Sequence, residues 1–168
     1  MLGLELCPFA GPVLRDGSLR IVVSEASAPE GQLQAFLSEL DKLQSAAEDA
    51  ISTTLLVLEK GPVDFAAFLD LLDDANRLID EAGLRGHLQI AHFHPAYQFE
   101  GEPPDGLSHY TNRSPLPTLH LLRESALERV LASYPDPEGI PARNIARLEA
   151  MGRGAVESLW EGFRPGGC

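Results

Sequence analysis

The chain has 168 residues, a length typical of one folding unit, so we expect a single domain over residues 1–168. Its net charge of −12 argues against a nucleic-acid partner and against an anionic membrane surface, because both are bound mainly through Lys and Arg. No apolar run approaches the roughly 18–20 residues that span a bilayer. The two cysteines, Cys7 and Cys168, show no CxxC spacing, and the start lacks a signal-peptide pattern, so we expect a cytoplasmic protein.

Strand and helix patterns alternate in the first half of the chain. Residues 19–24 (LRIVVS), 53–58 (TTLLVL) and 88–93 (LQIAHF) are short apolar runs that predict strands. Two helices are expected between them, one from the capping-box pattern of residues 27–30 and one from Asp64, stopped by Gly83. Two successive strand–helix–strand units imply parallel pairing with right-handed crossovers. Residues 13–17 end in Asp-Gly and predict a short antiparallel partner for residues 19–24.

Helical patterns fill the last third of the chain. Thr118 is expected to cap a helix that runs to about Ser133, with Leu119 and Leu122 on its buried side. Ile140 opens another helix, and residues 155–163 form a last one. The predicted fold class is therefore α/β: a small, mostly parallel sheet of at least three strands with an antiparallel edge hairpin, covered by helices, and a helical C-terminal third.

A long irregular segment, residues 94–117, separates the last predicted strand from these helices. It contains five prolines and two glycines and shows neither strand nor helix periodicity. Loops of this length in compact domains are often functional, and ligands bind at the carboxyl ends of strands in open parallel sheets. Four of the five histidines lie in this segment or close to its ends: His92, His94, His109 and His120. We therefore expect a polar site between His94 and Glu124.

Four short motifs along the chain resemble those of a known family. They are LCPFA at 6–10, FHPAYQFEG at 93–101, YTNRSP at 110–115 and LHLLRE at 119–124. Together they closely resemble the bacterial domain-of-unknown-function family 1415, over almost the whole chain. The resemblance implies no particular activity. It marks these motif positions: Cys7, His94, Tyr97, Gln98, Asn112, Arg113, His120, Arg123 and Glu124.

The first functional hypothesis is an enzyme that acts on a small anionic metabolite. His94 would transfer protons, because the pKa of imidazole lies near neutrality, and Cys7 or Tyr97 would assist. Arg113 and Arg123 would hold the anion through their planar donors. The full substrate-binding set is Gln98, Tyr110, Asn112, Arg113, Ser114, His120, Arg123 and Glu124.

Two alternatives stay open. In the first, the protein is a non-catalytic binding or structural module, and residues 94–117 are a hydrogen-bonded plug or a docking surface for a protein partner. In the second, His92, His94, His120 and Glu124 supply three imidazoles and a carboxylate to Zn²⁺ or another divalent metal; no cofactor is favoured. Gly-rich phosphate loops are missing after the first two strands, which disfavours the usual nucleotide enzymes.

Overall fold

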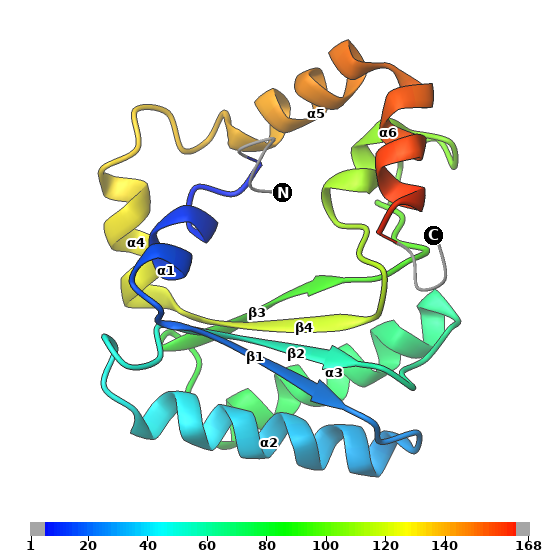
Figure 1. Cartoon of the computed structure of the whole chain (residues 1–168). Coiled ribbons are helices and arrows are strands. Elements are labelled where there is room, and N and C mark those ends of the chain that lie inside the picture. Colours follow the sequence, from blue (N-terminus) through cyan, green and yellow to red (C-terminus); the bar gives the residue numbers. More distant parts are fainter. Residues whose placement is uncertain (1–5, 164–168) are drawn as a thin grey trace.

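The computed structural model describes residues 6–163, and in it helices lie on both sides of a four-stranded sheet (Figure 1). The strands are β1 (Leu19–Ser24), β2 (Thr53–Leu58), β3 (Leu88–Phe93) and β4 (Thr118–Arg123). The helices are α1 (Ala10–Arg15), α2 (Pro29–Ser45), α3 (Phe65–Glu81), α4 (Glu124–Ala132), α5 (Ile140–Met151) and α6 (Arg153–Glu161), with a 3-10 helix η2 (Leu107–Thr111). None of the described helices is both long and apolar enough to cross a membrane.

The three predicted strands are confirmed, and so is the α/β class with a helical C-terminal part. The strand order is β1-β2-β4-β3. β1 and β2 are parallel, whereas β4 lies between β2 and β3 and is antiparallel to both. The expected mostly parallel sheet is thus corrected: β3 has the same direction as β1 and β2 but does not pair with them, because β4 occupies the position between.

β4 is the element that the sequence pattern misassigns. A helix from Thr118 is expected, but the helix begins only at Glu124. Leu119 and Leu121 are each 1% exposed and point into the core between the sheet and α2 and α3. A short leucine-rich run fits a helix period and a strand period equally well. Pairing with β2 on one side and β3 on the other satisfies the backbone groups of this run, and it therefore forms a strand.

The predicted edge hairpin is also corrected. Residues 10–15 form the helix α1 rather than a strand. Pro12 fits there, because the first N–H groups of a helix have no intrahelical acceptor. The turn itself is where it was expected: Gly17 has a φ of 78°, and the carboxylate of Asp16 accepts hydrogen bonds from the Ser18 N–H at 2.9 Å and hydroxyl at 2.6 Å.

α2 and α3 cover one face of the sheet and build the main core. Phe36, Leu43, Leu56 and Phe68 are fully buried in it. The predicted cap of α3 is confirmed, since the Asp64 carboxylate accepts a hydrogen bond from the Ala67 N–H at 3.0 Å. The capping box predicted for α2 does not form, and the helix begins at Pro29 without a side-chain cap.

The other face of the sheet is only partly covered. Val22 packs on the core, so its neighbours Ile21 and Val23 point to the opposite face, where they are 60% and 57% exposed. Beyond this face lies a second, smaller cluster of Leu6, Leu148 and Val156, formed by α5, α6 and the segment before α1. The long loop with η2 joins that cluster through Leu107 and Tyr110.

Candidate functional site

The 94–117 loop folds back onto the end of the strand from which it leaves. The His94 N–H donates to the Asn112 carbonyl at 3.2 Å, and the Asn112 side-chain amide donates to the His92 carbonyl at 3.3 Å. Asn112 thus closes the loop at its base, and the side chains between these points are held over the carboxyl end of β3.

His94 is fully buried, and both of its ring nitrogens are engaged by backbone groups. Nδ1 accepts from the Ala96 N–H at 3.1 Å, and Nε2 lies 3.0 Å from the Pro62 carbonyl, to which it donates because a carbonyl only accepts. The ring packs between Phe65 and Phe68, at centroid distances of 5.3 and 5.0 Å. Burial lowers its pKa. Neither nitrogen is left to exchange a proton with a ligand.

His109 holds the middle of the loop in the same manner. It is fully buried, its Nδ1 accepts from the Phe99 N–H at 3.1 Å, and its Nε2 donates to the Pro103 carbonyl at 2.8 Å. Sequence reasoning counted this histidine in the cluster without giving it a role. A histidine among Pro and Gly residues, with no periodicity around it, is the signal that fits such a loop anchor.

Tyr97 lies inside the loop, only 7% exposed. Its ring packs against Phe65, His92 and Phe99 at 4.9–5.3 Å. Burial raises the pKa of its hydroxyl, while a hydrogen bond with the side chain of Asn112 acts in the opposite direction. The neighbouring Gln98 is exposed. Tyr97 is thus placed as a packing residue, whereas its neighbour Gln98 faces solvent.

Arg113 differs from the other polar side chains of the loop. Its Nε donates to the Tyr97 carbonyl at 3.4 Å, and its guanidinium carbon lies 4.3 Å from the centroid of the Tyr110 ring. Within residues 6–163 its two terminal nitrogens have no hydrogen-bond partner. Ser114, by contrast, donates its hydroxyl to the Leu116 carbonyl at 2.6 Å. Arg113 is therefore the cationic residue of the loop, and it has spare donors.

Trp160 supports this arrangement and was missed by sequence reasoning. It meets Tyr110 edge to face, with ring centroids 6.2 Å apart and planes at 85°. Tyr110 is thus held between α6 and the Arg113 guanidinium. The only signal in the sequence is that Trp160 is the single tryptophan of the chain. Which residue it meets depends on how α6 packs.

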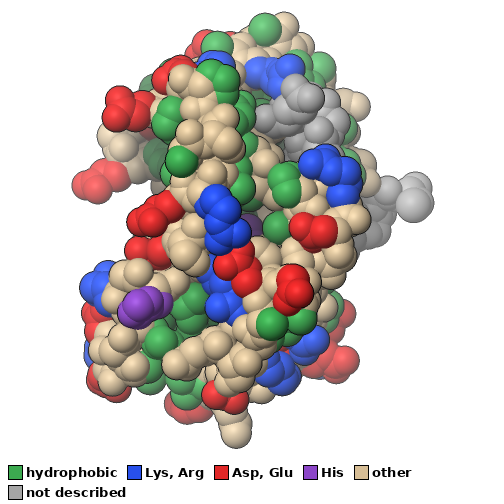
Figure 2. Space-filling view, turned by 90° about the vertical axis from the view of Figure 1, so that its left-hand side faces the viewer, with side chains coloured by type: hydrophobic (Ala, Val, Ile, Leu, Met, Phe, Trp, Pro, Cys, Tyr) green, Lys and Arg blue, Asp and Glu red, His purple; other side chains and the backbone are tan. Residues whose placement is uncertain are grey.

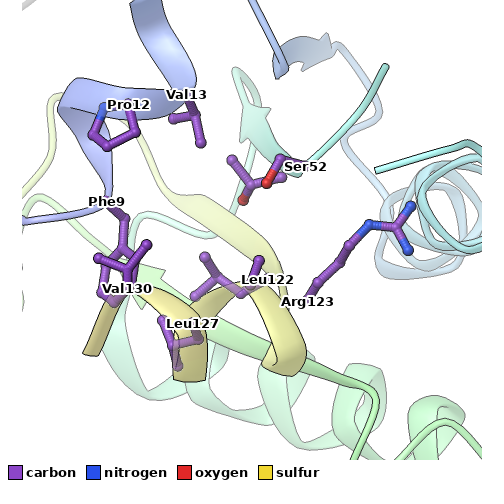
Figure 3. A pocket seen from close by; sticks show the side chains of 10 residues that line it. Phe9, Pro12, Val13, Ser52, Leu122, Arg123, Leu127 and Val130 are labelled. Carbon is purple, nitrogen blue, oxygen red and sulfur yellow. The ribbon is translucent and has the colours of Figure 1, made fainter. Parts of the chain in front are cut away.

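Arg123 is directed away from the loop, toward the carboxyl end of α2. Its Nη2 donates to the carbonyls of Leu43 and, at 2.8 Å, Ala46, and its Nε donates to the Ile51 carbonyl at 3.2 Å. Figure 3 shows the side chain pointing toward this helix. A cation at a helix carboxyl end complements the unpaired carbonyls there.

The predicted cluster of His94, Arg113 and Arg123 does not converge. In the β3–β4 register, Thr118 lies opposite Phe93 while Arg123 lies opposite Leu88. Arg123 is thus at the other end of the sheet from His94, five residues along β4, or about 17 Å. Glu124 is there too, its N–H donating to the His87 carbonyl at 2.9 Å.

His120 lies on the partly covered face of the sheet. The Thr53 hydroxyl donates to the Leu121 carbonyl at 2.7 Å, so it accepts from His120 Nε2, also at 2.7 Å. Nδ1 has no hydrogen-bond partner among the described residues. Burial lowers the pKa of this imidazole to about 4. His120 is therefore neutral at physiological pH and presents a hydrogen-bond acceptor.

The alternative metal set is not brought together. His92 pairs with the core-facing Leu119 and, as expected, shares a face with His94, whereas His120 pairs with Ala91 and faces the other way. Burial also lowers the pKa of His92. Throughout residues 6–163 there is no group of three His, Cys, Asp or Glu side chains that could hold a metal ion.

Cys7 lies just before α1 and is half-buried. Its carbonyl accepts from the Ala10 N–H at 3.4 Å, and its thiol makes no hydrogen bond to any described residue. No base is paired with it there. Cys168 lies outside the described residues.

Two depressions lie near the ends of β1 and β4. An apolar cavity of about 40 Å³ separates α1 and α4 from the sheet (Figure 3), large enough for water but far below the roughly 300 Å³ of a metabolite pocket. An open groove of about 530 Å³ is lined by Asp16, Ser18, Glu48, Asp49, Ser52 and Arg129. Figure 2 shows acidic and basic side chains intermixed over this side of the molecule, and Arg129 is paired with Glu48 at 2.8 Å.

The comparisons with known proteins give the same family that the four sequence motifs resemble. The model of one family, described as "Protein of unknown function (DUF1415)", matches residues 1–158. Neither a curated protein nor a solved structure matches the chain.

Proposed function

The chain belongs to this family of unknown function, and from that premise we propose that it is a non-catalytic binding domain in which residues 94–117 form a hydrogen-bonded plug and Arg113 binds an anionic group. The observation that carries the proposal is the contrast within the loop. His94 and His109 use both ring nitrogens on backbone groups, whereas Arg113 keeps its terminal nitrogens free among the described residues.

Arg113 is prepared for such a ligand by its own contacts. Stacking on Tyr110 and the bond from Nε to Tyr97 fix the plane of the guanidinium before a ligand arrives. A fixed planar fork loses less side-chain entropy on binding and matches the two oxygens of a carboxylate or phosphate. The ligand class supported is therefore a small molecule with a carboxylate or phosphate group.

The enzyme hypothesis has less support. His94 would have to break a backbone hydrogen bond before it could accept or donate a proton. Tyr97 is buried, with its pKa raised. Arg123, the second anion-holding residue of that hypothesis, is bonded to three carbonyls at the other end of the sheet.

Anion binding by Arg113 is testable with inorganic phosphate and succinate as probes. We expect wild-type protein to bind one of them in calorimetry and to gain thermal stability from it. Arg113→Gln should weaken that binding at least about tenfold, the effect of losing roughly 1.4 kcal/mol. The matched control is Arg77→Gln, which removes an exposed guanidinium on α3 that pairs with Asp74. Equal binding by both variants would contradict the role of Arg113.

The plug is tested separately through His94. His94→Ala removes a fully buried ring and both of its hydrogen bonds, to the Ala96 N–H and the Pro62 carbonyl, so we expect a loss of about 2–4 kcal/mol in the free energy of unfolding. His94→Asn keeps an acceptor near Nδ1 and should lose less. If His94→Ala retained wild-type stability but lost anion binding, the imidazole would act on the ligand and the plug would be wrong.

A further inference from the structure

β1 is an edge strand whose outward backbone groups have no partner among residues 6–163. The strand order places β1 beside β2 alone (Figure 1). The Ser18 and Ser24 carbonyls accept hydrogen bonds from the N–H groups of Ser52 and Glu59, which flank β2, at 2.9 and 3.0 Å. The even-numbered residues of β1 therefore face that strand. Because backbone groups alternate in direction along a strand, the N–H and C=O groups of Leu19, Ile21 and Val23 point away from the sheet.

The two edges of the sheet differ in how far their backbone groups are covered. Asn112 bonds to the His92 carbonyl and the His94 N–H and so covers part of the β3 edge. Among the described residues nothing comparable covers β1. Natural edges are usually protected by Pro, by a bulge or by an exposed charge. β1 has no proline, and Arg20, its single charge, is turned to the core side in an ion pair with Glu39 at 2.6 Å.

We propose that β1 pairs antiparallel with β1 of a second copy of this chain, so that one continuous sheet crosses a two-fold axis. With the axis at Ile21, the outward groups of Ile21 face their own copies, and those of Leu19 face Val23. On the open face, apolar side chains of the two copies then contact each other. Two of these side chains, Ile21 and Val23, are 60% and 57% exposed in one copy.

The same register avoids like charges. On the core side, Arg20 falls opposite Val22 rather than opposite its own copy. At the strand ends, Asp16 falls opposite Ala26, and Glu25 falls opposite Gly17. Like charges directly across a strand pair destabilise it. β1 is therefore self-complementary in charge as well as in hydrogen bonding, and this favours a second copy over an unrelated strand.

The dimer is weak and depends on salt. One strand pair buries less than the roughly 1,200 Å² of a standard stable interface, so association depends on protein concentration. Each copy also carries a net charge of −12. Since added salt screens the repulsion between copies, dimerisation strengthens as salt is raised.

Sedimentation equilibrium with two matched variants tests the interface. Val23→Lys places a charge at the edge, whereas Val63→Lys makes the same substitution at a residue that is 91% exposed and outside the sheet. Both change the net charge equally. Val63→Lys dimerises like wild type, and Val23→Lys weakens dimerisation at least about tenfold. A wild-type chain that stays monomeric at high salt and millimolar concentration, or two variants that dimerise equally, overturns the proposal.

Hydrogen exchange separates strand pairing from stacking of the two open faces. In the paired dimer, the amide hydrogens of Leu19, Ile21 and Val23 exchange more slowly as protein concentration rises. Ile21→Pro removes one outward N–H, leaves the ladder to β2 intact and abolishes the dimer. Two results contradict pairing between copies. In the first, these amide hydrogens exchange as fast in the dimer as in the monomer. In the second, their exchange slows only when another protein is added.

Discussion

The histidines of this protein show how a side chain suited to acid–base chemistry is used to build structure. His94 and His109 each accept a hydrogen bond from one backbone N–H and donate one to a backbone carbonyl. A neutral imidazole thus satisfies one donor and one acceptor of the backbone, as a neighbouring strand would. His120 satisfies Thr53 with one nitrogen only. In a buried setting the neutral form is favoured over the charged one, and the pKa values of His92, His94 and His120 are lowered accordingly.

The low pKa of His120 predicts a stability change in weak acid. Its pKa falls from 6.5 to about 4 on folding, so between these values the unfolded chain binds more protons. The contribution is complete above pH 6.5 and is lost as the pH falls to 4, about 2 kcal/mol after allowance for solvent at a half-buried ring. We expect urea unfolding of His120→Gln, which keeps a donor for Thr53, to lack this part of the pH dependence.

His92 and His94 titrate in the same direction, so the measurement is the difference between wild type and His120→Gln at each pH. Parallel stability curves for the two proteins from pH 4 to pH 7 would show that His120 does not carry the effect.

Individual elements are linked by side chains that reach far along the chain. Arg123, at the end of β4, donates to carbonyls at and just beyond the carboxyl end of α2 and at Ile51 before β2. It therefore ties β4, the last strand in the sequence, to the connection between the first two strands. This tie also explains the end of α2, whose last carbonyls are satisfied by a guanidinium instead of a local cap.

Substituting Arg123 by lysine tests this link. A lysine has one ammonium and cannot reach three carbonyls in different directions, so Arg123→Lys should lower the free energy of unfolding by about 2 kcal/mol. The control is Arg129→Lys on α4, where the guanidinium is exposed and pairs with Glu48; it should change stability by about 0.5 kcal/mol or less. Chemical denaturation of both variants decides, and equal losses would mean that the tie adds nothing beyond charge.

At the scale of the whole molecule, residues 6–163 form two hydrophobic clusters of unequal size. The larger lies between the sheet and helices α2 and α3, and the smaller joins α5, α6 and the segment before α1. Regions with few buried apolar contacts open at lower free energy than the main core. The helical C-terminal part is thus expected to be the first part of the fold to open.

Leu148→Ala tests the order of opening. Leu148 is 2% exposed in the smaller cluster, and its truncation should reduce the opening free energy of α5 and α6 by about 2–3 kcal/mol. Hydrogen exchange should accelerate in these helices while the amides of β2 and β4 keep their rates. Leu56→Ala, in the main core, is the matched control and should accelerate exchange everywhere. Equal acceleration of sheet and C-terminal amides by Leu148→Ala would mean that the protein unfolds as one unit.

Features that depend on neighbours along the chain could be predicted from the sequence: β1, β2 and β3 as short apolar runs, the Asp64 cap, the turn at Gly17, the helices from Ile140 onward, and membership of the family. Features that depend on distant partners emerged only with the folded chain. Whether residues 118–123 form a strand depends on two neighbouring strands, and whether Arg113 or Arg123 has free donors depends on which carbonyls the fold brings within reach. Local periodicity is written in adjacent residues, whereas the satisfaction of a buried polar group is settled by residues that folding alone makes neighbours.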